Sequence, residues 1–235
     1  MTVLDVTGLS KSFGGIQAVR DLEFSIEEDE IVGLIGPNGS GKTTTFNLIT
    51  GFLKPDAGTV LFDGDEITQK KPYTIAKLGL GRTFQISRPF GRLTVFENML
   101  VPNTEISTYS SETEDRIWSI LDELDIDHLA HNNANELSGG QKQLLEIARV
   151  LMLDPNFILL DEPAAGVNPA LMDDIIERIK SLNERGKTFL VVEHDMAVIR
   201  ALCDRLVVID SGHRIATGTF EEVQQNQKVR EAYLG

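Results

Sequence analysis

The sequence predicts an α/β protein with a parallel sheet core, an antiparallel β layer and an inserted α-helical lobe. Three short segments, EIVGLIG, NFILLDE and TFLVVEH, are apolar on both faces, which is typical of buried parallel strands. The N-terminal part instead alternates apolar and polar positions, with Leu22, Phe24 and Ile26 on one face, and GTVLFDGDEI predicts a strand closed by an Asp63-Gly64 turn. Because the buried segments end in polar residues, we expect a functional site at the carboxyl edge of a doubly wound sheet.

Composition limits the classes of function. The chain has 235 residues, of which 41 % are hydrophobic, so it can bury a sizeable core. Its 36 acidic and 22 basic residues give a net charge of -14, which disfavours binding to nucleic acid. No apolar run reaches the roughly 18 residues of a membrane span, and the first residues lack the pattern of an export signal, so we expect a cytoplasmic chain. The single cysteine, Cys203, is predicted to be a small apolar packing residue rather than a reactive thiol.

Helical periodicity replaces the strand pattern between about residues 86 and 152. Ser111 and Glu114 predict a capping box, followed by apolar residues on one helical face. Helical spacing also follows the segment LSGGQ, and Thr219 with Glu222 predicts the capping box of a C-terminal helix.

The segment GPNGSGKT, residues 36–43, matches the pattern G-x-x-x-x-G-K-[ST] between a predicted strand and a predicted helix. Such a P-loop turns tightly, so that backbone N–H groups and the helix dipole face a phosphate. Lys42 can reach the β and γ phosphates, and Thr43 offers a hydroxyl to Mg²⁺. An ordinary glycine-rich turn is disfavoured because strand, spacing and helix occur together. The predicted nucleotide-binding residues here are Gly36, Pro37, Asn38, Gly39, Ser40, Gly41, Lys42, Thr43 and Thr44.

Two further buried strands deliver ionisable side chains to the same edge. Asp161 can hold Mg²⁺ through its hydration shell, and Glu162 can act as the catalytic base for a water in line with the γ phosphate. Alone, an Asp-Glu pair would be a solvated turn; beside a P-loop it predicts a hydrolytic site. His194, after the third strand, is predicted to sense the γ phosphate, with a capping or packing role as the alternative.

Two other residues are candidates. Gln85, where the strand-rich part gives way to the helical lobe, carries an amide that can join Mg²⁺ or the attacking water; an ordinary loop residue is the alternative. Phe13, before two glycines, either stacks on adenine or closes a turn over the β layer, and the residues alone favour neither.

The segment LSGGQ precedes the helical pattern of the lobe. Ser138 is an ordinary helix cap, but two consecutive glycines have an entropic cost that a simple cap would avoid. Bare N–H groups beside a hydroxyl form a γ phosphate clamp, and a clamp on a separate lobe need not face its own P-loop. The candidate clamp comprises Leu137, Ser138, Gly139, Gly140 and Gln141.

In this order the motifs resemble the nucleotide-binding subunits of ATP-binding cassette (ABC) transporters over essentially the whole chain. GPNGSGKT resembles Walker A, Gln85 the Q-loop, LSGGQ the family signature, FILLDE Walker B and His194 the switch histidine. The resemblance implies a single domain, 1–235, with a nucleotide-binding core at 1–85 and 153–235 and a helical lobe at 86–152. It also implies an aromatic residue over adenine, which favours stacking by Phe13.

The resemblance further implies a Mg²⁺-dependent ATPase in which two subunits stack head to tail, each signature closing over its neighbour's ATP. FGGIQAV, DEPAAGVNP and VREAYLG are similar to the ATPases of branched-chain amino acid importers and their relatives for urea and short amides. Expected partners are a second ATPase subunit, transmembrane permeases contacted near Arg88 and Phe90, and indirectly a solute-binding protein. The expected location is the inner face of the cell membrane.

Three alternatives belong to other classes. A soluble ABC ATPase of iron-sulfur assembly is compatible with every ATP motif. A DNA-repair or translation ATPase is disfavoured by the single cassette, the lack of a heptad tract and the acidic balance. A binding module without catalysis is disfavoured because Lys42, Asp161, Glu162 and His194 occur together.

Overall fold

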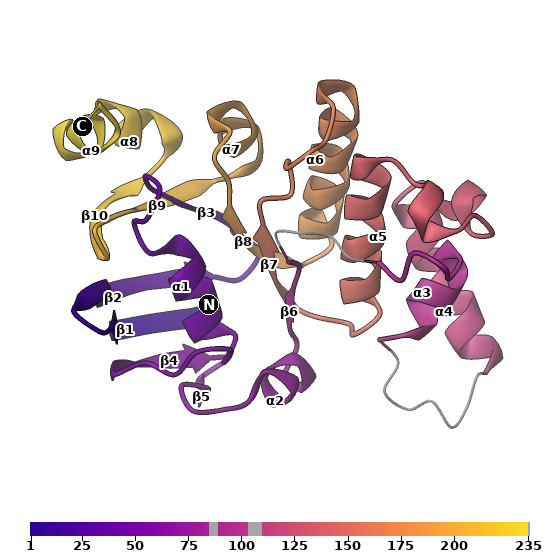
Figure 1. Cartoon of the computed structure of the whole chain (residues 1–235), viewed down its shortest axis with the longest axis horizontal. Helices are drawn as coiled ribbons and strands as arrows, with labels where there is room; N and C mark the ends of the chain where they lie inside the picture. The colour runs from indigo at the N-terminus through magenta and orange to yellow at the C-terminus, as the bar shows by residue number, and fades with distance from the viewer. Residues whose placement is uncertain (85–88, 103–109, 235) are drawn as a thin grey trace.

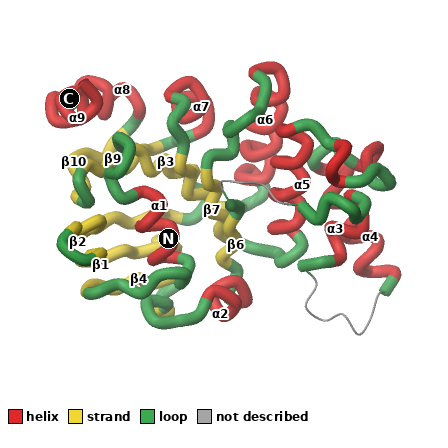
Figure 2. The backbone as a smooth tube through the Cα atoms, in the orientation of Figure 1, coloured by secondary structure: helices red, strands yellow, loops and turns green. Residues whose placement is uncertain are grey.

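The computed structural model describes residues 1–84, 89–102 and 110–234, and it confirms the predicted fold class. Figure 1 shows a β-rich core whose two sheets lie side by side, and α3 and α4 far from them at the opposite end. Figure 2 shows helices along the upper edge of the strands. No helix in the described ranges is both long enough and apolar enough to cross a membrane.

The antiparallel layer is a four-stranded sheet in the order β2-β1-β4-β5. Its strands are β1 (Thr2–Phe13), β2 (Ile16–Glu27), β4 (Ala57–Phe62) and β5 (Asp65–Glu66). Leu22, Phe24 and Ile26 are buried on one face of β2, as predicted. The Asp63-Gly64 turn is also confirmed, with φ angles of 49° and 79° that let β5 pair back onto β4.

The second sheet has six strands in the order β10-β9-β3-β8-β7-β6. All neighbouring strands in it are parallel except β10, which is antiparallel to β9. The three predicted buried strands are confirmed as β3 (Ile31–Ile35), β7 (Phe157–Asp161) and β8 (Thr188–Val192). The remaining strands were not among the predicted ones; they are β6 (Leu80–Arg82), β9 (Arg205–Asp210) and β10 (His213–Gly218).

The helices surround this second sheet and extend beyond it. The core contains α1 (Lys42–Ile49), α2 (Pro72–Lys77), α6 (Pro169–Glu184), α7 (Met196–Leu202), α8 (Phe220–Gln225) and α9 (Gln227–Leu234). The segment expected to be a lobe contains α3 (Val95–Leu100), α4 (Ser111–Glu123), η1 (Asp127–Leu129), η2 (Ala134–Glu136) and α5 (Gly139–Leu151).

Alternate residues of the parallel strands bury their side chains on opposite faces of the sheet. Phe189 and Val191 of β8 join a core made largely by α4, α5 and α6. Leu190 and Val192 join a second core with α1 and the antiparallel sheet. This burial on both faces holds the carboxyl ends of the central strands in place.

Two helix starts show how local sequence sets the boundaries. The capping box of Thr219 and Glu222 is confirmed at α8. The Ser111–Glu114 box is wrong, because Ser110 is the N-cap of α4 and its hydroxyl accepts a hydrogen bond from the Thr113 amide. Two adjacent serines offer the same capping chemistry, so the pattern alone could not set the register.

Candidate nucleotide site

The loop between β3 and α1 has the backbone geometry that a phosphate cradle requires. Gly39 and Gly41 have φ angles of 79° and 108°, which favour glycine. A Cβ atom at Gly41 would lie 2.5 Å from the carbonyl oxygen of Ala18, and one at Gly36 would collide with the backbone of Ile209. Bare backbone is therefore required on both flanks of the loop.

Lys42 lies across this loop. Its Nζ donates hydrogen bonds to the carbonyl oxygens of Gly36, at 2.7 Å, and Pro37, at 3.1 Å. Burial lowers the pKa of Lys42, while the charge of Glu162 opposes this shift. A partly desolvated ammonium group near a carboxylate gains more from an anionic ligand than a hydrated one.

A cavity of about 300 Å³ brings most of the predicted residues together. Glu162 and His194 line it from the ends of β7 and β8, together with Ala18, Asn38, Gly39, Ser40, Gly41, Lys42, Thr43 and Thr44. Ser40 Oγ is buried and has no hydrogen-bond partner within the described ranges. A cradle of glycine backbone, a lysine, a threonine hydroxyl and an unsatisfied serine hydroxyl fits a nucleoside triphosphate with its Mg²⁺.

Glu162 and His194 form the most direct contact across this cavity. His194 Nε2 lies 2.8 Å from Glu162 Oε1. Glu162 has a φ of 52°, and its amide donates to the carbonyl oxygen of Val192 at 2.8 Å. A left-handed conformation in a non-glycine residue is uncommon and costs free energy, and here the bond to β8 holds it.

Asp161 lies behind the cavity rather than in its lining. Its carboxylate accepts a hydrogen bond from Arg82 Nη2 at 3.0 Å, and its amide donates to Thr83 Oγ1 at 3.1 Å. Burial raises the pKa of Asp161, and the hydrogen bond and charge of Arg82 oppose that rise. Arg82 was not among the predicted site residues, because its partner Asp161 is 79 residues away along the chain and no local pattern joins the two.

Glu193 is a second residue that the sequence analysis did not assign to the site. It is buried, and its carboxylate accepts hydrogen bonds from the amides of Ala164, at 2.5 Å, and His194, at 2.9 Å. Glu193 therefore joins the loop after Glu162 to the loop that carries His194. Burial raises its pKa despite these bonds.

The LSGGQ segment forms the start of α5. Ser138 is the N-cap, and a capping box joins it to Gln141. A Cβ atom at Gly140 would collide with the Leu171 side chain, and one at Gly139 would lie 2.5 Å from the carbonyl oxygen of Gly166. Both glycines thus have a packing role within the chain, which the sequence argument from entropic cost did not include.

The same helix contacts the chain next to Gln85. Glu146 of α5 accepts a hydrogen bond from the Phe84 amide at 2.8 Å. Gln85 and Arg88 themselves lie outside the described residues. Phe13 lies at the end of β1, is 46 % exposed, and has Lys11 Nζ 5.8 Å from its ring centroid. It does not line the cavity.

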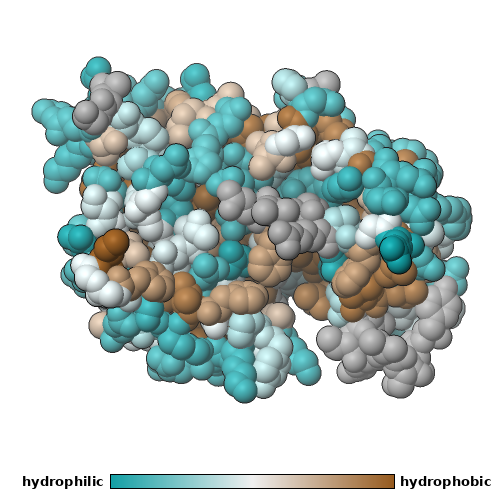
Figure 3. All heavy atoms as spheres, in the orientation of Figure 1, coloured by the Kyte–Doolittle hydropathy of each residue, from teal (hydrophilic) through white to brown (hydrophobic). Residues whose placement is uncertain are grey.

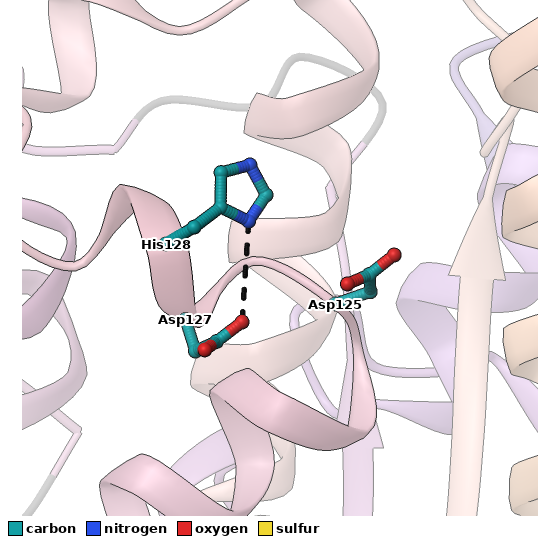
Figure 4. A group of neighbouring side chains, drawn as sticks. All are labelled: Asp125, Asp127 and His128. Carbon is teal, nitrogen blue, oxygen red and sulfur yellow. Dashed lines mark ion pairs between the residues drawn. The ribbon is translucent and has the colours of Figure 1, made fainter.

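A separate group of possible metal ligands follows α4. Asp125, Asp127 and His128 offer ligand atoms within 4.8 Å of one another, and Figure 4 shows the ion pair between the last two. Asp125 also pairs with Arg178 at 3.3 Å. These contacts explain the group as exposed ion pairs near a turn, so we assign no function to it.

The fold and the cavity define a P-loop nucleotide-binding protein. Comparisons with known proteins specify the family. Residues 19–165 match the family described as "ABC transporter", and residues 213–235 match "Branched-chain amino acid ATP-binding cassette transporter". The chain belongs to the ABC transporter family and carries its ATP-binding domain, as the resemblance predicted, so binding and hydrolysis of ATP are its activity.

Several relatives cover the whole chain. A probable branched-chain amino acid transport ATP-binding protein LivG of Archaeoglobus fulgidus is 40% identical over 100% of this chain and 96% of its own length. The high-affinity branched-chain amino acid transport ATP-binding protein BraF of Pseudomonas aeruginosa is 40% identical over 99% of this chain and 98% of its own length. The lipopolysaccharide export system ATP-binding protein LptB of Escherichia coli is 38% identical over 100% of this chain and 98% of its own length.

Solved structures agree. The ADP conformation of an ATP-binding cassette of an ABC transporter superposes with a TM-score of 0.92, at 37% identity, over 100% of this chain and 99% of that one. The dimeric structure of a bacterial ABC transporter cassette superposes with a TM-score of 0.81, at 29% identity, over 92% of this chain and 98% of that one.

Proposed function

We propose that this protein is the Mg²⁺-dependent ATPase subunit of a membrane importer, with branched-chain amino acids or related small polar solutes as cargo. The observation that carries the ATPase part of the proposal is the 2.8 Å contact between Glu162 and His194 in the P-loop cavity. A carboxylate held beside a phosphate cradle can accept the proton of an attacking water, and a histidine next to it can respond to the γ phosphate.

Each remaining residue has a defined task in this proposal. Lys42 and the P-loop amides bind the phosphates, while Thr43, Asp161 and Gln85 hold the Mg²⁺. A bound Mg²⁺ supplies positive charge that offsets the negative charge of the phosphates. Phe13 stacks on the adenine. Stacking is possible because the Phe13 ring, at the end of β1, is exposed and not enclosed by other parts of the chain.

A second ATPase subunit completes the site. The clamp residues Leu137–Gln141 do not line the cavity that holds the P-loop. Ser138 and the amides after it therefore serve the ATP of a neighbouring subunit, either an identical chain or a related one. The dimeric cassette among the similar structures supports this arrangement.

Permease subunits are the proposed membrane partners, and they place the chain on the inner face of the cell membrane. A groove of about 240 Å³ is lined in part by Arg82 and Phe84, which come shortly before Gln85 in the sequence. Its exposed large side chains include Phe52, Tyr73 and Phe84, at 53%, 64% and 48% exposure. Clustered exposed aromatic residues favour contact with another protein. The visible face in Figure 3 is mostly hydrophilic, with apolar side chains gathered locally.

The cargo and the direction of transport rest on the relatives. The match of residues 213–235 and the LivG and BraF relatives favour transport of branched-chain amino acids, and the importer resemblance of the sequence motifs favours inward transport. The LptB relative favours export as a second candidate. Purification of the tagged protein from membranes in mild detergent tests import against export. Co-purified permeases that take up leucine, urea or a short amide in proteoliposomes support import, and permeases without such uptake contradict it.

The catalytic part is tested by Glu162→Gln. ATP hydrolysis should fall about 10²-fold or more, because the amide cannot accept a proton. ATP should then trap a dimer that gel filtration resolves from the monomer. A variant that remains active and monomeric would refute both the role of Glu162 and the composite site.

A further inference from the structure

Arg82 lies between the candidate metal carboxylate and the groove proposed for the permease. It is the last residue of β6, and 8% of its side chain is exposed. One side of the guanidinium contacts Asp161 of β7. Arg82 also lines the groove, together with Phe52 and Phe84.

The guanidinium uses its planar fork to join two elements. Nη2 donates to Asp161 Oδ2 at 3.0 Å, while Nη1 donates to Asn47 Oδ1 at 2.6 Å and Thr50 Oγ1 at 3.0 Å. The last two residues belong to α1 and its C-cap, so Arg82 ties the helix of the P-loop to the end of β7. A lysine could not reproduce this pattern, because an ammonium group lacks the fixed fork.

Three aromatic rings enclose the same guanidinium. Its Cζ lies 5.7 Å from the ring centroid of Phe46, 5.6 Å from that of Phe52 and 5.2 Å from that of Phe84. Phe52 and Phe84 also contact each other edge to face, with centroids 5.8 Å apart. A cation–π cage over a buried arginine restricts where its charge can lie.

A purely structural role accounts poorly for this arrangement. A buried ion pair has a large desolvation cost, and apolar side chains of similar volume often stabilise a core as well or better. A fixed orientation of Asp161 accounts for the arrangement better, because the guanidinium engages one named carboxylate oxygen and is itself held by Asn47 and Thr50.

We infer that Arg82 is a positioning residue that holds Oδ2 of Asp161, so that the other carboxylate oxygen serves the Mg²⁺ bound with ATP. Phe52 and Phe84, which line the groove, pack on the same guanidinium, so they link the groove lining to the orientation of Asp161. This inference rests on the proposed role of Asp161 in holding Mg²⁺.

The experiment measures binding of a fluorescent ATP analogue, once with Mg²⁺ and once with EDTA, in a background of Glu162→Gln and Ser138→Asn, which should neither hydrolyse the analogue nor dimerise on it. The dissociation constant in EDTA divided by the dissociation constant with Mg²⁺ reports how much Mg²⁺ contributes to affinity, and a lower ratio means a smaller contribution. Arg82→Met should lower this ratio about tenfold, while the affinity in EDTA changes less than about twofold. Arg82→Lys should lie between Arg82→Met and the parent protein. Phe52→Ala should lower the ratio by a smaller factor.

Matched controls separate positioning from stability. Arg205→Met removes an arginine that pairs with Glu30 through two hydrogen bonds, of 2.6 Å and 2.8 Å, at another place. Leu78→Ala removes a partly exposed apolar side chain outside the groove lining. Both should keep the parental ratio. If Arg82→Met does not fold, the ratios measured for Arg82→Lys and Phe52→Ala still decide whether Arg82 positions Asp161.

The outcomes are distinct. A parental ratio in all Arg82 and Phe52 variants overturns the inference. Asp161→Asn shows which idea has failed: if it also keeps the ratio, the metal role of Asp161 is wrong, and if it lowers the ratio while Arg82→Met does not, only the role of Arg82 is wrong. A lowered ratio in Arg82→Met with an unchanged ratio in Phe52→Ala overturns the link to the groove.

Discussion

Nε2 of His194 and Oε1 of Glu162 lie 2.8 Å apart, although the two residues follow different strands, β7 and β8. These strands pair in parallel, with Asp161 opposite Val192. The register of the sheet therefore determines which histidine meets which carboxylate. Backbone hydrogen bonds deep in the core thus set the geometry of the proposed chemistry.

His194→Ala should reduce ATP turnover about 10- to 100-fold with little change in ATP affinity, because it removes a contact to the proposed base and leaves the P-loop intact. Steady-state hydrolysis and equilibrium ATP binding measure the two effects. His128→Ala is the control, since this exposed histidine lies in the separate group after α4. Equal losses of affinity and turnover in His194→Ala would assign the residue to ground-state binding.

Gly140→Ala should destabilise the monomer by about 1–3 kcal/mol, because the new Cβ would collide with Leu171 of α6. Urea unfolding measures the change. Gly140→Ala should cost less unfolding free energy in a Leu171→Ala background than in the parent protein. A double-mutant cycle detects this difference as a favourable coupling. Zero coupling would mean that the contact does not restrict position 140.

Ser138→Asn separates the cap of α5 from the proposed clamp. Asparagine caps helices as well as serine does, so the unfolding free energy should change by only a few tenths of a kcal/mol. The larger side chain should nevertheless prevent ATP-driven dimerisation and turnover. Analytical ultracentrifugation with ATP measures this in the Glu162→Gln background. A dimer of parental strength would restrict Ser138 to its role as a helix cap.

Glu193→Gln should change how stability depends on pH. Burial raises the pKa of Glu193 above its ordinary 4.5, so the native state binds this proton more tightly than the unfolded state does. The resulting stabilisation is fully present below pH 4.5 and is lost as the pH rises through the raised pKa. The unfolding free energy of the parent, minus that of Glu193→Gln, should therefore fall across this window.

Cys203 should resist alkylation in the native protein. Burial raises the pKa of its thiol to about 12, so at pH 8 only about 10⁻⁴ of it is thiolate. Iodoacetamide should modify the native chain at least about 100-fold more slowly than the chain in urea. Mass spectrometry can follow the reaction, and similar rates in both states would contradict the assignment as an inert packing residue.

The sequence predicted the parts of the fold that depend on local pattern. Buried strands of five residues, the Asp63-Gly64 turn and the cap at Thr219 each have a signal within one element. The strand β6 has only three residues, which is too short for a periodicity to appear. The contacts of Arg82 with Asp161 and of Gly140 with Leu171 join distant segments, so only the folded chain brings them together.

The hydrogen bond from the Phe84 amide to Glu146 has a consequence for exchanging parts between relatives. A helical segment transplanted into this core would need an acceptor side chain at the position of Glu146, or a partly buried amide would lose its hydrogen bond. Every residue except proline supplies this backbone donor at position 84, so the requirement falls on the incoming helix. Position 146 therefore joins position 140, which packs against Leu171, among the positions to compare before a chimera is built.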